Sequence, residues 1–251
     1  MQLPVHICNA SRELGWFGGA QSHFTLHWHS VKRILANSKT ACHTDTLPLQ
    51  VKRNIIGVLA LQGDFAAHAR VLESLGQDVR LVQVPRDLEP LGGIVIPGGE
   101  STVMSRLCER YGLLEPLRQS VQGGLPAFGT CAGLIFLAKR LEGEAQTFEQ
   151  STLDALDCTV ARNAYGAQRE SFQTRIEVPL LDGSIEATFI RAPRVVQSGE
   201  DVEVLARFED SPVVVRQGNI LGCAFHPEIA GEARMHQLWI AGIESRKGES
   251  E

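Results

Sequence analysis

The five residues Gly129-Thr130-Cys131-Ala132-Gly133 place one cysteine between two glycines, where one apolar segment runs directly into another. The preceding residues 125–128 have the composition of a short buried strand, and residues 134–140 have that of a helix. A sharp strand-to-helix turn exposes a nucleophile, and the N–H groups and dipole of a helix N-terminus favour the thiolate over the thiol. Cys131 is therefore a candidate nucleophile. A buried cysteine in a glycine-flanked turn is the alternative that this motif alone leaves open.

A histidine and a glutamate two positions apart, His226 and Glu228, follow the apolar segment 220–224. Residues i and i+2 of an extended backbone point to the same side, so Glu228 can orient the His226 ring while the other ring nitrogen faces a cysteine. A cysteine nucleophile needs such a base, held by a third group. A single histidine beside a proline is usually structural, but the neighbouring glutamate and the position after a strand favour a catalytic role.

The segment Pro97-Gly98-Gly99-Glu100-Ser101 also follows an apolar stretch, residues 93–96. Two successive glycines let the backbone turn N–H groups toward a ligand, and such groups stabilise the oxyanion of a tetrahedral intermediate. Taken alone, the glycine pair predicts only a turn. Three such motifs at three predicted strand ends indicate an acyl-transfer site at one edge of a sheet, where open α/β sheets bind their ligands.

The elements that must position these motifs alternate regularly after residue 54. The continuous apolar run 55–61 predicts a central parallel strand that is covered on both faces. The following segments predict strands at 78–84 and 93–97 and helices at 64–75, 102–111, 113–122 and 233–244. The alternating patterns of the second half predict antiparallel strands added to that sheet, at 175–178, 185–190, 202–207 and 213–216. We therefore predict an α/β fold with a mostly parallel central sheet, helices on both faces and added antiparallel strands.

Residues 1–53 differ from the rest of the chain. They hold five of the eight histidines and carry six basic residues against two acidic ones, and they show no sustained period of 2 or 3.6. We predict that residues 1–53 are an extension, disordered or not native to the protein, and that residues 54–251 form one domain. His23, His27 and His29 have no nearby carboxylates, so no metal site is expected.

Composition excludes several classes of protein. The net charge is −5 and there is no block of Lys and Arg, which argues against nucleic acid as a partner. The apolar runs are interrupted well before the ~18 residues that a membrane helix needs, so no membrane span is expected. The six cysteines are scattered without a Cys-x-x-Cys pair, which predicts neither a zinc site nor a disulfide framework. A reducing, cytoplasmic location fits best.

Taken together, the three motifs resemble those of the class I, or triad, glutamine amidotransferases. Within that class, four more segments resemble the PdxT/SNO family, the glutaminase subunits of pyridoxal 5′-phosphate synthase: Leu61-Gln62-Gly63, Arg162-Asn163-Ala164-Tyr165-Gly166, Glu170-Ser171-Phe172 and Phe189-Ile190-Arg191-Ala192-Pro193. The resemblance runs from about residue 55 to about residue 243 and does not include residues 1–53. It implies the class I glutamine amidotransferase fold, which is flavodoxin-like.

The resemblance also implies an activity and its residues. L-glutamine would be hydrolysed to glutamate and ammonia by a triad of Cys131, His226 and Glu228. The oxyanion hole would be formed by the N–H groups of Gly99 and Ala132. Glutamine would be bound by Gly99, Glu100, Ser101, Arg162, Ile190 and Arg191.

The partner implied by the resemblance is the synthase subunit of pyridoxal 5′-phosphate synthase, which would receive the ammonia within a large hetero-oligomer. Gln62 would lie near this interface and take part in activation. No cofactor is implied, because pyridoxal phosphate is made by the partner. Two alternatives stay open: a glutaminase subunit of another amidotransferase, against which the Arg162–Gly166 motif argues, and a non-catalytic redox or stress protein, which has no need of the His226 and Glu228 pair.

Overall fold

The computed structural model of the chain describes residues 55–142, 150–162 and 171–247. The predicted extension, residues 1–53, lies outside these ranges, as do the three histidines considered as metal ligands. Residues 163–170, which belong to two of the family-like segments, also lie outside them.

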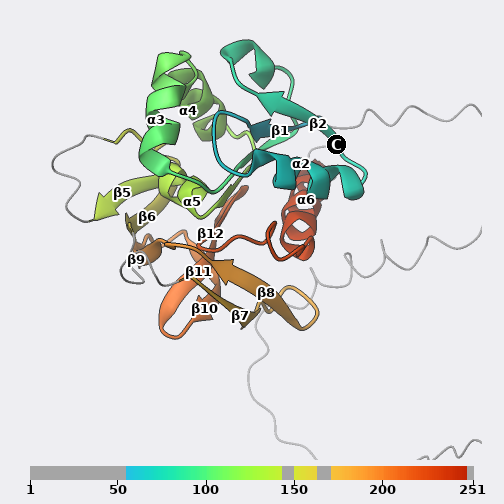
Figure 1. Cartoon of the computed structure of the whole chain (residues 1–251), viewed down its shortest axis with the longest axis vertical. Coiled ribbons are helices and arrows are strands. Elements are labelled where there is room, and N and C mark those ends of the chain that lie inside the picture. The colour runs from blue at the N-terminus through green and yellow to red at the C-terminus, as the bar shows by residue number, and fades with distance from the viewer. Residues whose placement is uncertain (1–54, 143–149, 163–170, 248–251) are drawn as a thin grey trace, which may run out of the picture. The chain divides into compact units, whose positions relative to one another are not determined.

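A seven-stranded sheet forms the centre of the described domain, with the strand order β10-β11-β12-β4-β3-β1-β2 (Figure 1). Five neighbouring strands run parallel to one another: β2, β1, β3, β4 and β12. β11 pairs antiparallel with β12, and β10 pairs antiparallel with β11. Every residue of β3, β4 and β12 is buried, as expected of parallel strands covered on both faces. The strands are β1 Ile55–Leu59, β2 Asp78–Val82, β3 Gly93–Ile96, β4 Ala127–Thr130, β10 Glu203–Phe208, β11 Ser211–Gln217 and β12 Ile220–Cys223.

Helices cover both faces of this sheet (Figure 1). One face carries α2 and α6, and the other carries α3, α4 and α5. Their bounds, with that of a short 3₁₀ helix, are α2 Phe65–Ser74, α3 Ser101–Arg110, α4 Leu114–Gln122, α5 Ala132–Leu137, α6 Arg234–Lys247 and η1 Pro85–Leu88. The predicted α/β class, with its parallel sheet, two helical layers and antiparallel additions, is confirmed. No helix of the described ranges is long and apolar enough to span a bilayer.

Two smaller sheets correct the prediction. A three-stranded sheet contains β5 Ala138–Glu142, β6 Leu156–Ala161 and β9 Arg194–Ser198, and a two-stranded sheet contains β7 Phe172–Glu177 and β8 Ser184–Phe189. The predicted helix 134–140 is wrong beyond Leu137, because the following residues pair in parallel with β6. The strands predicted at 175–178 and 185–190 exist, but they pair only with each other in these sheets instead of extending the central one. The strands predicted at 202–207 and 213–216 do extend it.

The short helix α5 lies unusually close to the sheet. A Cβ atom at Gly133 would collide with the carbonyl oxygen of Ile96 in β3. Only glycine allows this approach, which holds the start of α5 directly against the end of the strand. The turn between β4 and α5 is fixed as a result, and Cys131 occupies that turn.

The topology brings the predicted motifs together. β12, β4, β3 and β1 are neighbours in the sheet and run parallel, so their carboxyl ends share one edge. The segments that follow these strands contain His226, Cys131, Gly99 and Gln62 respectively. This is the edge at which an open α/β sheet binds its ligands.

Candidate active site

Cys131 lies on a strained turn, but its side chain is buried and not exposed as the sequence predicted. Its φ is 49° and its ψ is −104°, a region that non-glycine residues rarely adopt. The surrounding structure holds it there: its N–H donates to the carbonyl of Cys223 at 2.9 Å, and its carbonyl accepts the N–H of Leu134 at 3.1 Å. Because β12 and α5 both hold this backbone, the side chain points in one defined direction.

The Cys131 side chain meets two of the residues predicted for the site. It lies close enough to the imidazole of His226 to raise the pKa of that ring through hydrogen bonding and charge, against the opposing effect of burial. Its sulfur also lies 3.7 Å from the carbonyl oxygen of Ile190. The predicted nucleophile and the predicted base, 95 positions apart in the sequence, are therefore neighbours in the fold.

His226 is held on several sides. Its Nδ1 lies 2.7 Å from Oε1 of Glu228, and both residues are buried. Its backbone N–H donates to the carbonyl of Thr188 in β8 at 2.8 Å. A Cβ atom at Gly98 would collide with the imidazole, so the glycine pair after β3 lies directly against the ring. Because Nδ1 binds the carboxylate, Nε2 is left to face the thiol. This is the arrangement that the base of a catalytic triad requires.

The charges of the site stabilise each other. Burial lowers the pKa of His226, but hydrogen bonds and charge from Cys131 and Glu228 outweigh it and raise the pKa to about 10. Burial raises the pKa of Glu228, but hydrogen bonds from His226 and His68 outweigh it and hold the pKa well below its usual range. At neutral pH the site therefore holds a carboxylate beside an imidazolium, which is a proton donor ready for a leaving group.

Gln62 lies against the loop predicted to stabilise the oxyanion. Its Oε1 accepts the N–H of Glu100 at 3.0 Å, and a Cβ atom at Gly99 would fall 2.9 Å from its Nε2. That Nε2 is buried and has no hydrogen-bond partner within the described ranges. Ala132 is the first residue of α5, so its N–H is one of those left without a partner inside the helix. The loop N–H groups and the helix N-terminus thus lie at the same edge as Cys131.

The residues predicted to bind glutamine fall into two groups. Glu100 and Arg162 form an ion pair at 3.4 Å, and the buried Ser101 donates its hydroxyl to Oε1 of Gln150 at 3.2 Å. Ile190 and the exposed Arg191, whose φ is 46°, adjoin the nucleophile through the contact of the Ile190 carbonyl. Gln150 was not predicted, because it precedes β6 and no motif marks it.

His68 and His236 were also not predicted. Both are fully buried, and they connect to Glu228 behind the triad. The sequence pattern that could have identified His68 is its position on the buried face of α2, beside Ala67 and on the same face as Leu72. Among the described residues, no group of three or more His, Cys, Asp or Glu side chains is arranged to hold a metal ion.

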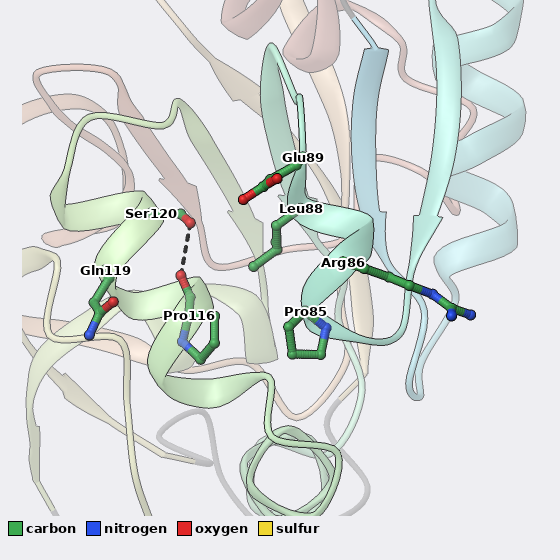
Figure 2. A pocket seen from close by; sticks show the side chains of 7 residues that line it. All are labelled: Pro85, Arg86, Leu88, Glu89, Pro116, Gln119 and Ser120. Carbon is green, nitrogen blue, oxygen red and sulfur yellow. Dashed lines mark hydrogen bonds between the residues drawn. The ribbon is translucent and has the colours of Figure 1, made fainter.

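A separate surface pocket lies between η1 and α4 (Figure 2). It is lined by Pro85, Arg86, Leu88, Glu89, Pro116, Gln119 and Ser120. Its Ser120 hydroxyl is engaged with the carbonyl of Pro116 at 2.8 Å, within α4. None of the predicted site residues lines it, so it is not the candidate active site.

Comparison with known families decides the relationship of the chain. The model of the SNO glutamine amidotransferase family matches residues 58–245. The chain belongs to this family. The family predicted from the sequence is therefore confirmed, and the match begins within β1 and ends within α6.

Individual relatives agree with the SNO assignment. The chain is 52% identical over 189 residues to the pyridoxal 5′-phosphate synthase subunit PdxT of Corynebacterium diphtheriae, covering 75% of this chain and 100% of that protein. It is 47% identical over 192 residues to PdxT of Halalkalibacterium halodurans, covering 76% of this chain and 96% of that protein.

Solved structures agree on the fold. A crystal structure described as a glutamine amidotransferase matches with a TM-score of 0.70 and 45% identity, covering 75% of this chain and 98% of that one. A protein from Thermoplasma acidophilum, described as a GMP synthase component, matches with a TM-score of 0.56 at 18% identity, covering 79% and 98%. The second match shows the fold alone. The class I glutamine amidotransferase fold predicted for this SNO chain is confirmed.

Proposed function

We propose that this chain is the glutaminase subunit of a pyridoxal 5′-phosphate synthase: it hydrolyses L-glutamine to glutamate and ammonia and passes the ammonia to a synthase subunit. Its membership in the SNO glutamine amidotransferase family and its similarity to proteins named PdxT support the activity and the partner. The observation that carries the chemistry is the contact of Cys131, on its strained turn, with His226, whose other nitrogen is held by Glu228.

The first half of the reaction makes a thioester. The thiolate of Cys131 attacks the side-chain amide carbon of glutamine, and the amide oxygen becomes an oxyanion that the N–H groups of Gly99 and Ala132 stabilise. When the intermediate collapses, the carbon–nitrogen bond breaks, and the imidazolium of His226 gives its proton to the departing nitrogen, so that ammonia leaves.

The second half regenerates the enzyme. The neutral imidazole of His226 now takes a proton from water, which attacks the thioester, and the sulfur of Cys131 leaves as thiolate with release of glutamate. Glu228 keeps Nδ1 protonated and stabilises the imidazolium in both halves. The pair of His226 and Glu228, 2.7 Å apart, therefore supports two proton transfers: His226 gives a proton in the first half and takes one in the second.

Glutamine would be held by the two groups of residues around Cys131. We assign its α-carboxylate to Arg162 or Arg191, because a guanidinium can meet a carboxylate with two parallel hydrogen bonds. Glu100 and Ser101 at the N-terminus of α3 and the carbonyl of Ile190 offer acceptors for its ammonium and amide groups. The ion pair of Glu100 with Arg162, 3.4 Å long, supports this assignment, because it places a positive and a negative group side by side there.

The partner would complete the oxyanion hole. In the chain alone, Gln62 accepts the N–H of Glu100 and lies against Gly99, while its own Nε2 has no hydrogen-bond partner in the part of the chain that the structure describes. Docking of the synthase subunit that moves Gln62 would free these loop groups for the substrate. We propose that the two proteins work together in a large hetero-oligomer in the cytoplasm, where the four described cysteines, all free thiols, would remain reduced.

Ammonia release from L-glutamine, measured with and without a pyridoxal 5′-phosphate synthase subunit, tests this function. We expect release that rises severalfold when the synthase subunit is added, together with formation of pyridoxal phosphate from glutamine nitrogen. A synthase subunit from another class of amidotransferase is the control and is expected to give no stimulation. Absence of ammonia under every condition would refute the proposed activity, and stimulation by the control alone would refute the proposed partner.

We also propose that residues 54–251 form the glutaminase domain and that residues 1–53 are dispensable. The matches to the PdxT relatives cover 94% to 100% of each relative but only 74% to 76% of this chain. This difference supports the proposed division. A variant that begins at Asn54 is expected to keep the thermal midpoint and the partner-dependent turnover of the full chain. A large drop in the midpoint would show instead that the first residues stabilise the domain.

A further inference from the structure

Two buried histidines behind the triad have no part in the mechanism described above. His68 lies on α2 and His236 on α6, the two helices that cover the same face of the sheet, and both side chains are fully buried. Buried polar rings are unfavourable unless they are hydrogen-bonded. These two form a chain with the catalytic residues, and this chain suggests what they do.

The two carboxylate oxygens of Glu228 face two different imidazoles. Oε1 lies 2.7 Å from Nδ1 of His226, and Oε2 lies 3.4 Å from Nε2 of His68. Among the described residues the buried Oε2 makes no geometrically complete hydrogen bond, and Nε2 of His68, 3.4 Å away, is the imidazole nitrogen that faces it. The same Nε2 lies 3.1 Å from the hydroxyl oxygen of Thr130, the residue before Cys131. One side chain of α2 therefore contacts both the carboxylate and the strand that presents the nucleophile.

The hydrogen-bond network selects one proton arrangement for the two rings. Nδ1 of His68 lies 2.9 Å from Nε2 of His236, and Nδ1 of His236 is buried with no hydrogen-bond partner among the residues described. If His236 donates from Nε2 to His68, then His68 donates from Nε2 toward Glu228 and Thr130, and every ring N–H meets an acceptor. The reverse arrangement would leave a buried N–H on His236 unpaired and would turn a lone pair of His68 toward a carboxylate.

His236 is itself held in place. Its ring packs edge-on against Phe128 of β4, with the centroids 5.2 Å apart and the planes at 85°. Because its helix, α6, presents it against β4, the ring meets His68 from a fixed direction. The network thus runs from a ring packed on the sheet, through His68, to the carboxylate that orients the base.

We propose, on the basis of the proposed glutaminase function, that His68 is a positioning residue of the triad: it holds Glu228 through Oε2 and thereby sets the orientation of His226, and His236 fixes the tautomer of His68. The role resembles the outer hydrogen bonds that orient the ligands of metal sites. The groups that face His68 and Glu228 are His226, His236 and Thr130, and the thiol of Cys223 lies near enough to Glu228 that its pKa, raised by burial, is raised further by the carboxylate charge. The proposal predicts an effect on turnover rather than on glutamine binding.

A pair of amide variants tests this role. Glutamine can bring its Nε2 donor near the position of the His68 Nε2, whereas asparagine is too short to reach Glu228. We expect His68→Asn to lower kcat about 10- to 100-fold with KM unchanged, since misplacement of a catalytic group by about 1 Å costs about this much. His68→Gln is expected to restore most of kcat. Leu72→Val, on the same buried face of α2, is the control for a general loosening of the helix and is expected to keep kcat.

A second readout does not depend on activity. The proton shared by Nδ1 of His226 and Glu228 should give a downfield ¹H resonance in the enzyme without substrate. We expect this resonance to shift or broaden in His68→Asn and to persist in His68→Gln and Leu72→Val. If wild-type protein shows the resonance but releases no ammonia, the proposed function fails while the network stands. If His68→Asn keeps both kcat and the resonance, or if Leu72→Val is equally damaging, the positioning role is refuted.

The variants are compared only when their thermal midpoints show that they fold. Should His68→Asn fail to fold, His236→Leu takes its place, because it keeps His68 but removes the ring that orients it. It is expected to lower kcat in the same direction by a smaller factor, again with KM unchanged. Unchanged kcat and an unchanged resonance in His236→Leu would refute the role of His236 and of the network.

Discussion

Replacing Cys131 by alanine is expected to lower partner-stimulated glutaminase turnover by about 10⁴-fold or more. The thiolate forms the covalent bond to glutamine, and removing the nucleophile of a triad leaves only the residual catalysis of binding and oxyanion stabilisation. Ammonia release with the synthase subunit present measures the effect. Glutamine should still bind, so KM for any residual turnover and the thermal shift caused by glutamine are expected to stay close to those of the wild type.

The matched control for this variant is Cys158→Ala, which removes another fully buried thiol, from β6 in the three-stranded sheet. It is expected to keep turnover, with only the loss of stability that a small cavity brings. A glutamine-like electrophile should label Cys131 in the wild type and in the control, but label nothing in Cys131→Ala. If Cys131→Ala retains turnover near that of Cys158→Ala, the nucleophile is assigned to the wrong residue.

The candidate site could be proposed from the sequence because its parts are local motifs that follow parallel strands. Cys131 and the Gly98-Gly99 pair each mark a strand end, and His226 with Glu228 marks a third. The sequence cannot show which strands are adjacent, but parallel strands joined by helices place all their carboxyl ends on one side. The contact between Cys131 and His226 follows from that rule and from the neighbouring positions of β4 and β12.

The segment Ala138–Glu142 shows where local reasoning fails. Its leucine, alanine, lysine and arginine residues are good helix formers, so the sequence favours a continuation of α5. The chain instead becomes β5, because Leu141 pairs with Val160 and Arg140 with Thr159, whose hydroxyl accepts the Arg140 Nε–H at 3.0 Å. Pairing between distant segments decides the conformation there, and no local pattern reports it.

The histidines behind the triad were hidden for a similar reason. His68 and His236 are 168 positions apart and meet only because α2 and α6 cover the same face of the sheet. Each histidine taken alone resembles an isolated polar residue in an amphipathic helix. Their purpose depends on a third residue, Glu228, whose second carboxylate oxygen faces His68. A role of this kind can be found only after the helices have been placed.

Replacing His226 by alanine is expected to abolish turnover, by at least about 10⁴-fold, whereas Glu228→Gln is expected to lower it by about 10²- to 10³-fold. In the proposed mechanism the imidazole carries the proton in both halves of the reaction, while the carboxylate only orients and stabilises it. Turnover of the two variants with the synthase subunit present measures the difference. Equal and mild effects in both variants would argue against a triad at these positions.

The pH dependence of the Glu228→Gln variant distinguishes its role further. In the wild type, hydrogen bonds and charge from Cys131 and Glu228 overcome burial and raise the pKa of His226 to about 10, so the imidazolium is lost only as pH rises through that value. Without the negative charge of Glu228 this pKa is lower. The alkaline limb of kcat/KM is therefore expected to move to lower pH, and an unmoved limb would mean that Glu228 does not act on the imidazole.

Glu232→Gln is the matched control, because Glu232 is a buried carboxylate in the same loop that pairs with Arg234 instead of the triad. Its pKa is lowered because the hydrogen bonds and charge of Arg234 outweigh burial, so the loss of its charge affects the stability of the loop. The control is expected to keep the wild-type pH profile even where its thermal midpoint falls. A shift of the alkaline limb in Glu228→Gln alone would tie the proton of His226 to the carboxylate 2.7 Å away, and not to the negative charge of the loop as a whole.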